Sequence, residues 1–327
     1  MPQAVNPHRA ASVSIGECMV ELARDADGRF RLSYGGDTFN TAVYLARAGI
    51  RAAYATALGD DPYSGAIIDL ARREGVETSA IAVVPGRMPG LYLIETSDRG
   101  ERTFYYWRDR SPARELLEGP GAEAAIRALQ RAGLVYVSGI TLSLYTERGL
   151  DRLEQALAGA RSGGATIAMD SNYRPRGWNN DVRRAGEVMR RFWALADVGL
   201  PTFDDETVLW GDVDPQATAT RLAALGVREI AVKLGAAGAL VQADDAATRV
   251  PAPAEVEPLD TTGAGDSFNA AYLAARMQGT PPAAAAAAGH ALAGVVVQHR
   301  GAIVPQDATA VVLSASRRGQ PPDAPAQ

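Results

Sequence analysis

The sequence predicts an α/β fold in which a mostly parallel, doubly wound sheet carries helices on both faces. Two sets of segments support this prediction. Short apolar runs of strand length occupy residues 12–16, 52–58, 134–139, 166–170, 198–201 and 229–234. Stretches of helical periodicity separate them, at residues 38–48, 63–73, 122–131, 147–160, 183–195 and 215–225. Strands that alternate with helices in this way are typical of parallel strands joined by crossover helices.

A second, smaller β-sheet is predicted by two segments that interrupt this alternation. Residues 91–108 have the pattern of two strands around the turn at 97–100, and residues 18–34 have a similar pattern around 25–28. An isolated two-stranded ribbon is only marginally stable in water, so we expect the two ribbons to pair. Such an insertion is either a lid over a cleft, spanning about residues 18–34 and 88–110, or a surface hairpin without a function.

The composition restricts the kind of partner and the compartment. The chain has 327 residues and a net charge of -5, which argues against a nucleic-acid or anionic-membrane partner. It has one cysteine, Cys18, and three histidines, so neither an internal disulfide nor a Cys/His zinc site is expected. Because no apolar stretch reaches the length of a membrane-spanning helix, we expect a cytoplasmic protein. Residues 12–314 should form the domain, with disordered ends at 1–11 and 315–327.

The most informative segment for function is a glycine-containing loop at residues 259–269, followed by an apolar helical pattern over 270–277. Gly263 and Gly265 free backbone N–H groups at the start of a helix, where phosphate or a developing anionic oxygen can bind. As an isolated fact, Gly-x-Gly-Asp is more often a capped helix than an active site. Phe268 replaces the third glycine of a dinucleotide fingerprint, and no Walker motif occurs, so neither common nucleotide loop is present.

This loop, Asp260-Thr-Thr-Gly-Ala-Gly-Asp266, resembles the C-terminal signature of the ribokinase-like (carbohydrate kinase PfkB) family. Three other segments resemble motifs of that family in the same order along the chain. They are the sugar-binding glycine pair with its asparagine (residues 35–40), the Asp-x-Asn-x-Arg run beside the phosphates (170–175), and the glycine turn before the nucleotide pocket (233–238). The resemblance extends over residues 14–305 and implies the ribokinase-like fold with a small β-sheet lid.

The resemblance also implies the roles of individual residues in a kinase that uses ATP with Mg²⁺, and it leaves a monovalent cation as an open possibility. Asp266 would be the catalytic base, with the N–H groups of Gly263, Ala264 and Gly265 stabilising the transferring oxygens. The residues implied for ATP are Asn172, Arg174, Lys233, Gly235, Gly238, Gly263 and Gly265. The family's Asn-x-x-Glu motif lacks its asparagine here, where Thr202 stands, so no metal residue is assigned, with Asp205 or Glu206 as the possible carboxylate.

Within the family, residues 16–22, 90–92, 102–108, 138–140 and 172–178 are most similar to kinases of 2-keto-3-deoxygluconate. This sugar is an acid, and a planar guanidinium binds a carboxylate through two parallel hydrogen bonds. Arg108 and Arg174 are the candidates, although a lone arginine is more often a solvated surface charge. The residues expected at the sugar are Gly35, Gly36, Asn40, Tyr92, Tyr105, Tyr106, Arg108, Arg174 and Asp266. The expected reaction phosphorylates the C6 hydroxyl and gives 2-keto-3-deoxy-6-phosphogluconate and ADP.

Two alternatives remain open from the sequence. One is a kinase for fructose or another neutral sugar, and the other is a non-catalytic sugar-binding regulator on the same fold. The presence of Asp266 argues against the second alternative, because loss of the base would be its expected mark. Apolar residues in the predicted lid, Leu91, Leu93 and Ile94, favour a homo-oligomer formed through the lid sheet.

Overall fold

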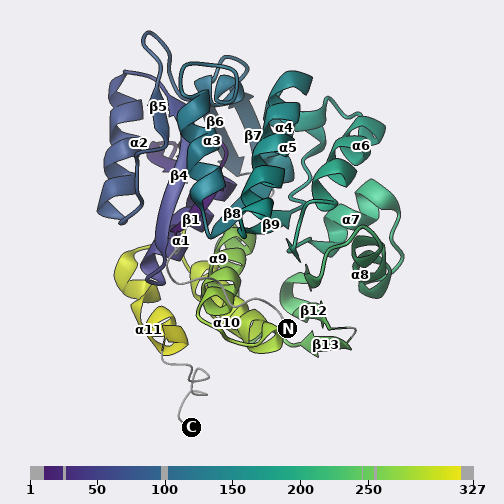
Figure 1. Cartoon of the computed structure of the whole chain (residues 1–327). Helices are drawn as coiled ribbons and strands as arrows, with labels where there is room; N and C mark the ends of the chain where they lie inside the picture. Colours follow the sequence, from purple (N-terminus) through teal and green to yellow (C-terminus); the bar gives the residue numbers. More distant parts are fainter. Residues whose placement is uncertain (1–10, 25–26, 97–101, 245, 254–255, 318–327) are drawn as a thin grey trace.

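A nine-stranded sheet forms the centre of the protein in the computed structural model, which describes residues 11–24, 27–96, 102–244, 246–253 and 256–317 (Figure 1). The order of its strands is β13-β12-β11-β10-β9-β8-β1-β4-β5. The bounds are β1 (Ala11–Ile15), β4 (Arg51–Leu58), β5 (Ile81–Val83), β8 (Leu134–Ser138), β9 (Thr166–Asp170), β10 (Val198–Gly199), β11 (Glu229–Lys233), β12 (Ala239–Ala243) and β13 (Ala246–Val250). All six predicted strands are present, and together with β5 they form a set of seven parallel strands. β12 and β13 add an antiparallel edge next to β11.

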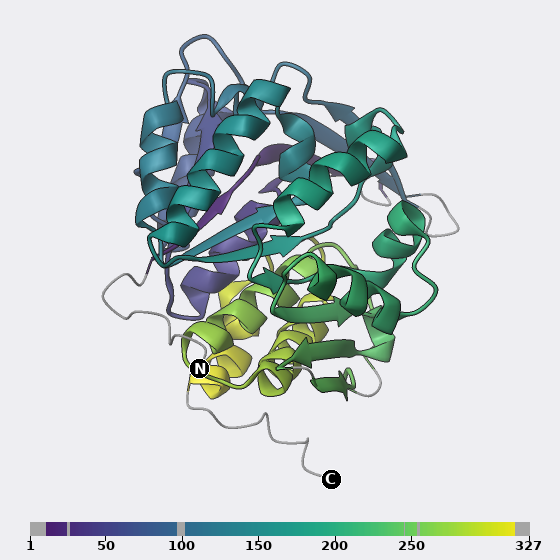
Figure 2. The ribbon, with the colours of Figure 1, turned by 45° about the vertical axis from the view of Figure 1, so that its right-hand side comes forward.

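Helices cover both faces of this sheet, as predicted (Figure 2). Side chains alternate along each central strand, so that Val135 and Val137 of β8 enter one core while Leu134 and Tyr136 enter the other. The first core is closed by α3 (Ala122–Arg131), α4 (Gly139–Leu144), α5 (Glu147–Ser162), α6 (Val182–Trp193), α7 (Phe203–Trp210) and α8 (Pro215–Ala224). The other face is covered by α1 (Asp37–Arg47), α2 (Pro62–Arg73), α9 (Ala264–Met277), α10 (Pro282–Val296) and α11 (Gln306–Arg317).

The two ends of the predicted domain need correction. Ala11 already pairs with Arg51 in the sheet, and α11 continues to Arg317, past the predicted boundary at 314. The helix can continue because the first glycine after its start is Gly319. The rest of the two predicted disordered ends, residues 1–10 and 318–327, lies outside the described residues. No helix in the described part of the chain combines the length and the apolar character that crossing a membrane requires.

The second sheet has four strands in the order β3-β2-β6-β7 and is separate from the first. Its strands are β2 (Met19–Arg24), β3 (Phe30–Gly35), β6 (Leu91–Thr96) and β7 (Arg102–Trp107). The two ribbons pair through β2 and β6, which run parallel, and this confirms the predicted pairing. The predicted turn at 25–28 lies partly outside the described residues, and the one at 97–100 lies wholly outside them.

The functional motifs follow the carboxyl ends of the main strands, where ligands bind in open α/β sheets. Asp170 is the last residue of β9, and Lys233 is the last residue of β11. The small sheet begins just after β1 ends, so it projects from the same edge. Three short 3₁₀ turns complete the connections, at Pro112–Glu115 (η2), Pro175–Trp178 (η3) and Gly235–Ala237 (η4).

Candidate active site

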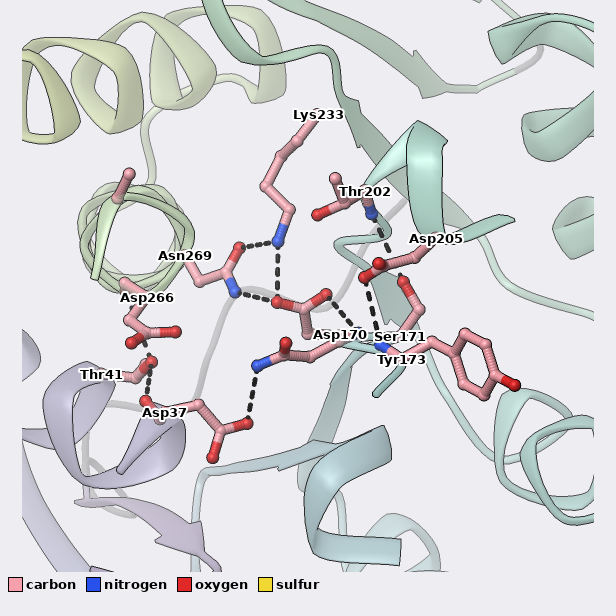
Figure 3. Close-up of polar contacts among 12 residues, drawn as sticks. Asp37, Thr41, Asp170, Ser171, Tyr173, Thr202, Asp205, Lys233, Asp266 and Asn269 are labelled. Carbon is pink, nitrogen blue, oxygen red and sulfur yellow. Dashed lines mark hydrogen bonds and ion pairs between the residues drawn. The ribbon is translucent and has the colours of Figure 1, made fainter. Parts of the chain in front are cut away.

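A buried lysine and a carboxylate form the centre of the polar cluster in Figure 3. Lys233 Nζ donates to Asp170 Oδ2 at 2.7 Å and to Asn269 Oδ1 at 3.1 Å. Asn269 Nδ2 in turn donates to Asp170 Oδ2 at 2.7 Å. Both charged groups are buried, so the pairing and the additional hydrogen bonds offset the cost of removing them from water. These contacts fix the position of the Lys233 ammonium group at the carboxyl edge of the sheet, in a pair that is neutral overall.

Asp266 lies beside this cluster, in the first turn of α9. Gly263 precedes the helix with φ 77°, and a Cβ there would lie 2.9 Å from Ala302 Cα, so glycine is required by both conformation and space. Asn40 Nδ2 donates to Asp266 Oδ2 at 2.8 Å. Burial raises the pKa of Asp266 to about 7, with a further contribution from the nearby Asp37 carboxylate. A carboxylate with such a pKa is well matched to accept a proton near neutral pH.

Asp37, Asp170 and Asn269 are parts of the cluster that sequence reasoning did not assign to the site. Asp37 accepts a hydrogen bond from Asn172 Nδ2 at 2.9 Å, and burial raises its pKa. Asn172 has φ 30° and its N–H donates to Asp170 Oδ1 at 3.2 Å, so it links the two carboxylates. A signal for Asn269 was available, because it lies three residues after Asp266 and hence on the same side of α9.

The two candidate metal carboxylates occupy different environments. Asp205 Oδ2 accepts from the Tyr173 N–H at 3.1 Å, and Oδ1 accepts from Arg174 Nη1 at 3.3 Å, so Asp205 lies at the site loop. Glu206 is fully buried and pairs with Arg221 at 2.5 Å, and the Ser171 side chain is a further polar neighbour. No cluster of three or more metal-ligating side chains occurs among the described residues. Mg²⁺ that accompanies a nucleotide usually takes only one or two carboxylates, so the Asp205 carboxylate fits such an ion.

The glycine pair brings the small sheet close to α1. A Cβ on Gly36 would lie 2.0 Å from the Glu17 carbonyl oxygen, so no larger residue fits there. A Cβ on Gly35 would lie 3.3 Å from Tyr92 Oη and 3.5 Å from Asn40 Oδ1. The predicted sugar residues of the small sheet and of α1 are thus brought together around Gly35.

The predicted tyrosines and Arg108 divide between the two faces of the small sheet. Tyr92 and Tyr106 are paired across β6 and β7, with ring centroids 5.9 Å apart. Tyr105 pairs with Leu93 and therefore points to the opposite face, because side chains alternate along a strand. Arg108 lies 5.9 Å from the Tyr106 ring and forms an ion pair with the buried Glu17. Tyr106, and not Tyr105, shares a face with Tyr92 and Arg108.

The residues predicted to meet ATP are distributed along the same edge. Gly235 and Gly238 form the turn between β11 and β12, where a Cβ on Gly238 would lie 2.1 Å from the Val250 carbonyl oxygen. A Cβ on Gly265 would lie 3.7 Å from Lys233 Nζ, so the start of α9 faces the lysine. The Ala264 N–H is directed at the Thr261 carbonyl, in a long hydrogen bond of 3.3 Å. The turn, the lysine and the helix start thus line one side of the cluster.

The chain is similar over most of its length to known sugar kinases. The model of the pfkB family carbohydrate kinases matches residues 9–309. A 2-dehydro-3-deoxygluconokinase of Dickeya dadantii is 40% identical over 304 residues, covering 90% of this chain and 96% of that protein. The enzyme of the same name from Escherichia coli strain K12 is 40% identical, with 90% and 97% covered.

Two solved structures have the same fold. The 2-dehydro-3-deoxygluconokinase of Thermotoga maritima has a TM-score of 0.81 at 24% identity, with 93% of this chain and 99% of that chain covered. A putative ribokinase II of Escherichia coli in complex with ATP and Mg²⁺ has a TM-score of 0.81 at 20% identity, with 95% and 100% covered. The predicted ribokinase-like fold is confirmed. The chain belongs to the pfkB family of carbohydrate kinases.

Proposed function

We propose that this protein transfers the terminal phosphate of ATP to the C6 hydroxyl of 2-keto-3-deoxygluconate, also called 2-dehydro-3-deoxygluconate, which gives the 6-phosphate and ADP. The observation that supports catalysis most strongly is the buried Asp266 carboxylate at the start of α9, whose pKa burial raises to about 7. The choice of substrate is supported by the names of the relatives that are 40% identical. Their coverage of nearly the whole chain argues for the same reaction.

In this mechanism Asp266 accepts the proton of the C6 hydroxyl as the hydroxyl oxygen attacks phosphorus. Asn40 keeps the accepting carboxylate oriented through its 2.8 Å hydrogen bond. Lys233 and the N–H groups of Gly263, Ala264 and Gly265 reduce the negative charge on the transferring oxygens, with Ala264 giving up its long bond to Thr261. Mg²⁺, when bound with ATP near Asp205, would supply further charge neutralisation. Asn172, Arg174, Gly235 and Gly238 would line the nucleotide side.

The sugar would lie between the cluster and the small sheet, near Gly35, Gly36 and Asn40. Arg108 and Arg174 are the groups proposed to bind its carboxylate, with Tyr92 and Tyr106 beside it. Each arginine already has one acidic neighbour, Glu17 for Arg108 and Asp205 for Arg174. A carboxylate that holds one edge of a guanidinium fixes the direction of its remaining N–H groups. With such pairs, binding of the sugar carboxylate would depend more on the direction of the arginine N–H groups than on net charge.

We also propose that a second copy of the chain covers the outer face of the small sheet, and that the protein is cytoplasmic. The register places Leu32, Leu22, Leu93 and Tyr105 in one row across this face. Tyr105 is 43% exposed and Trp107 is 60% exposed. The same apolar surface on a second copy would match it through a two-fold axis. Light scattering that gives the mass of a monomer would contradict this part of the proposal.

ATP consumption with a panel of acid and neutral sugars tests the proposed substrate. We expect turnover with 2-keto-3-deoxygluconate and little with fructose or ribose. Replacing Arg108 by Lys keeps the charge but removes the planar fork, so KM for the acid sugar should rise about 10-fold, with KM for ATP unchanged. Equal efficiency with a neutral hexose would favour the neutral-sugar alternative, and no turnover with any sugar would favour the regulator.

A further inference from the structure

Arg108, Arg174 and Arg176 differ in their partners, and two of them, Arg108 and Arg176, lie near the Tyr106 ring of the small sheet. Arg108 pairs with Glu17, and Arg174 pairs with Asp205. Arg176 has no ion pair with any carboxylate of the described residues. Its Nη1 instead donates to the backbone carbonyl of Phe104 at 2.9 Å. Its guanidinium carbon lies 5.7 Å from the centroid of the Tyr106 ring. Both partners of Arg176 therefore belong to β7.

The elements that Arg176 joins belong to different parts of the molecule. Arg176 lies in η3, which directly follows the site loop at residues 172–174. Trp178 of the same turn is buried in the core of the main sheet, so η3 is fixed to the main body. β7 is the edge strand of the small sheet, and an edge strand carries backbone groups without a partner strand. Arg176 satisfies one such carbonyl from across the gap between the two sheets.

Tyr106 connects Arg176 to two residues expected at the sugar, Arg108 and Tyr92. Two guanidinium groups lie near its ring, with the guanidinium carbon of Arg108 at 5.9 Å and that of Arg176 at 5.7 Å from the centroid. It also contacts the rings of Tyr92 at 5.9 Å and Phe104 at 6.3 Å. A ring held by several flat partners has little freedom to rotate away from its position. Arg176 thus contacts the same ring that lies beside Arg108 and Tyr92.

We propose that Arg176 is a positioning residue for the sugar subsite: it fixes β7 to the main body and so holds Tyr106 and Arg108 at the distance from Asp266 that the acid sugar requires. The inference rests on the proposed function, because it takes the space between the small sheet and Asp266 to be the sugar subsite. Any donor can make the hydrogen bond, whereas a planar guanidinium makes the better ring contact because it can also stack on the aromatic face. Lysine can therefore replace the hydrogen bond and only part of the ring contact.

Steady-state kinetics of Arg176→Ala and Arg176→Lys test this role. We expect Arg176→Ala to raise KM for 2-keto-3-deoxygluconate about 10-fold, with kcat and KM for ATP changed less than about 2-fold, because one hydrogen bond and one cation–π contact are lost. KM for the acid sugar in Arg176→Lys should lie between the values of the wild type and of Arg176→Ala. The matched control is Arg183→Ala, which removes an arginine that is 83% exposed and pairs only with Glu187 of its own helix in the described contacts. It should leave all constants unchanged.

A double-mutant cycle identifies Tyr106 as the intermediary. If Arg176 acts through Tyr106, adding Arg176→Ala to Tyr106→Ala should raise KM much less than it does in the wild type. Fully additive effects, or an unchanged KM in Arg176→Ala, would overturn the proposal. A simple loss of stability would instead lower the apparent kcat and the melting temperature of Arg176→Ala and Arg176→Lys and leave KM unchanged.

Amide hydrogen exchange without any ligand separates this inference from the proposed function. Exchange of the β7 amides should be faster in Arg176→Ala than in the wild type, while the β9 amides exchange equally. Equal protection of β7 in both proteins would contradict the anchor even if the enzyme is active. Faster exchange of β7 in a protein that phosphorylates no acid sugar would leave the anchor intact and refute the proposed function.

Discussion

Asp266 and Glu206 are two buried carboxyl groups whose pKa values are raised to about the same value in different surroundings. Burial raises the pKa of each to about 7. Asp266 is bound by the neutral amide of Asn40, and the charged groups that act on it are the carboxylates of Asp37 and Asp170, which raise its pKa, and Lys233, which lowers it. Glu206 is bound by Arg221, which also pairs with Asp212 at 2.7 Å.

The raised pKa of a carboxyl group therefore reflects its burial, whereas its hydrogen-bond and ion-pair partners indicate what the group can do. A carboxylate held by a neutral amide beside other carboxylates gains stability when it takes up a proton, as a general base must. A carboxylate held by an arginine loses part of that pairing when it is protonated. We therefore propose a catalytic role for Asp266 and a structural role for Glu206, and three measurements can contradict this distinction.

The largest effect is expected from Asp266→Asn. The amide cannot accept the C6 proton, so kcat should fall by roughly 10²–10⁴-fold, the usual scale of general-base catalysis. The melting temperature at pH 8 should not fall, because the substitution removes a buried charge that Asp37 and Asp170 repel. A folded Asp266→Asn protein with near-normal kcat would falsify the assignment.

A second, intermediate effect is expected in the pH dependence of the wild type. Only ionised Asp266 can act as the base, so kcat/KM should fall about tenfold per pH unit below a pKa of about 7. Stability should have the opposite slope. Burial raises the folded-state pKa of Asp266 and of Glu206 above the values in the unfolded chain, so the folded state binds more protons between about pH 4 and 7. The free energy of unfolding that these two groups contribute therefore decreases as pH rises through that range.

The smallest effect is expected from Glu206→Gln, which keeps the size of the side chain and removes its charge. The free energy of unfolding at pH 8 should change by no more than about 1–3 kcal/mol, because Arg221 loses one partner but keeps Asp212, and this loss is offset by the removal of a buried charge whose pKa burial raises. The pH profile of kcat/KM should remain that of the wild type, while part of the stability slope disappears. A shifted activity profile in Glu206→Gln would mean that Glu206, too, contributes to proton transfer.

The main sheet could be predicted from the sequence because its buried strands are long apolar runs and its crossover helices are long enough to show periodicity. Short elements were not predicted, because α4 and α7 have too few turns, and β5 with three residues too few positions, to show a periodicity. The antiparallel edge of β12 and β13 was missed because strand periodicity is weak where one strand is largely exposed.

The candidate site was predictable where a motif carries it, as at Asp266 and Gly263. Partners distant in sequence were not predictable from local patterns. The ion pair of Arg108 with Glu17, the choice between Asp205 and Glu206, and the faces of Tyr105 and Tyr106 all depend on how separate elements pack. A sequence shows that a charge exists at a position, but the tertiary fold decides whether that charge is already neutralised.

The hydrogen bond from Asn40 to Asp266 joins residues that are 226 positions apart. During synthesis on the ribosome, α1 emerges long before α9, so Asn40 has no Asp266 to bind until nearly the whole chain has been made. Contacts of such separation form late, because the loop between them must be ordered first. Return of kinase activity after refolding should therefore report the last step of assembly, and a nascent chain released before α9 would have a sheet but no catalytic centre.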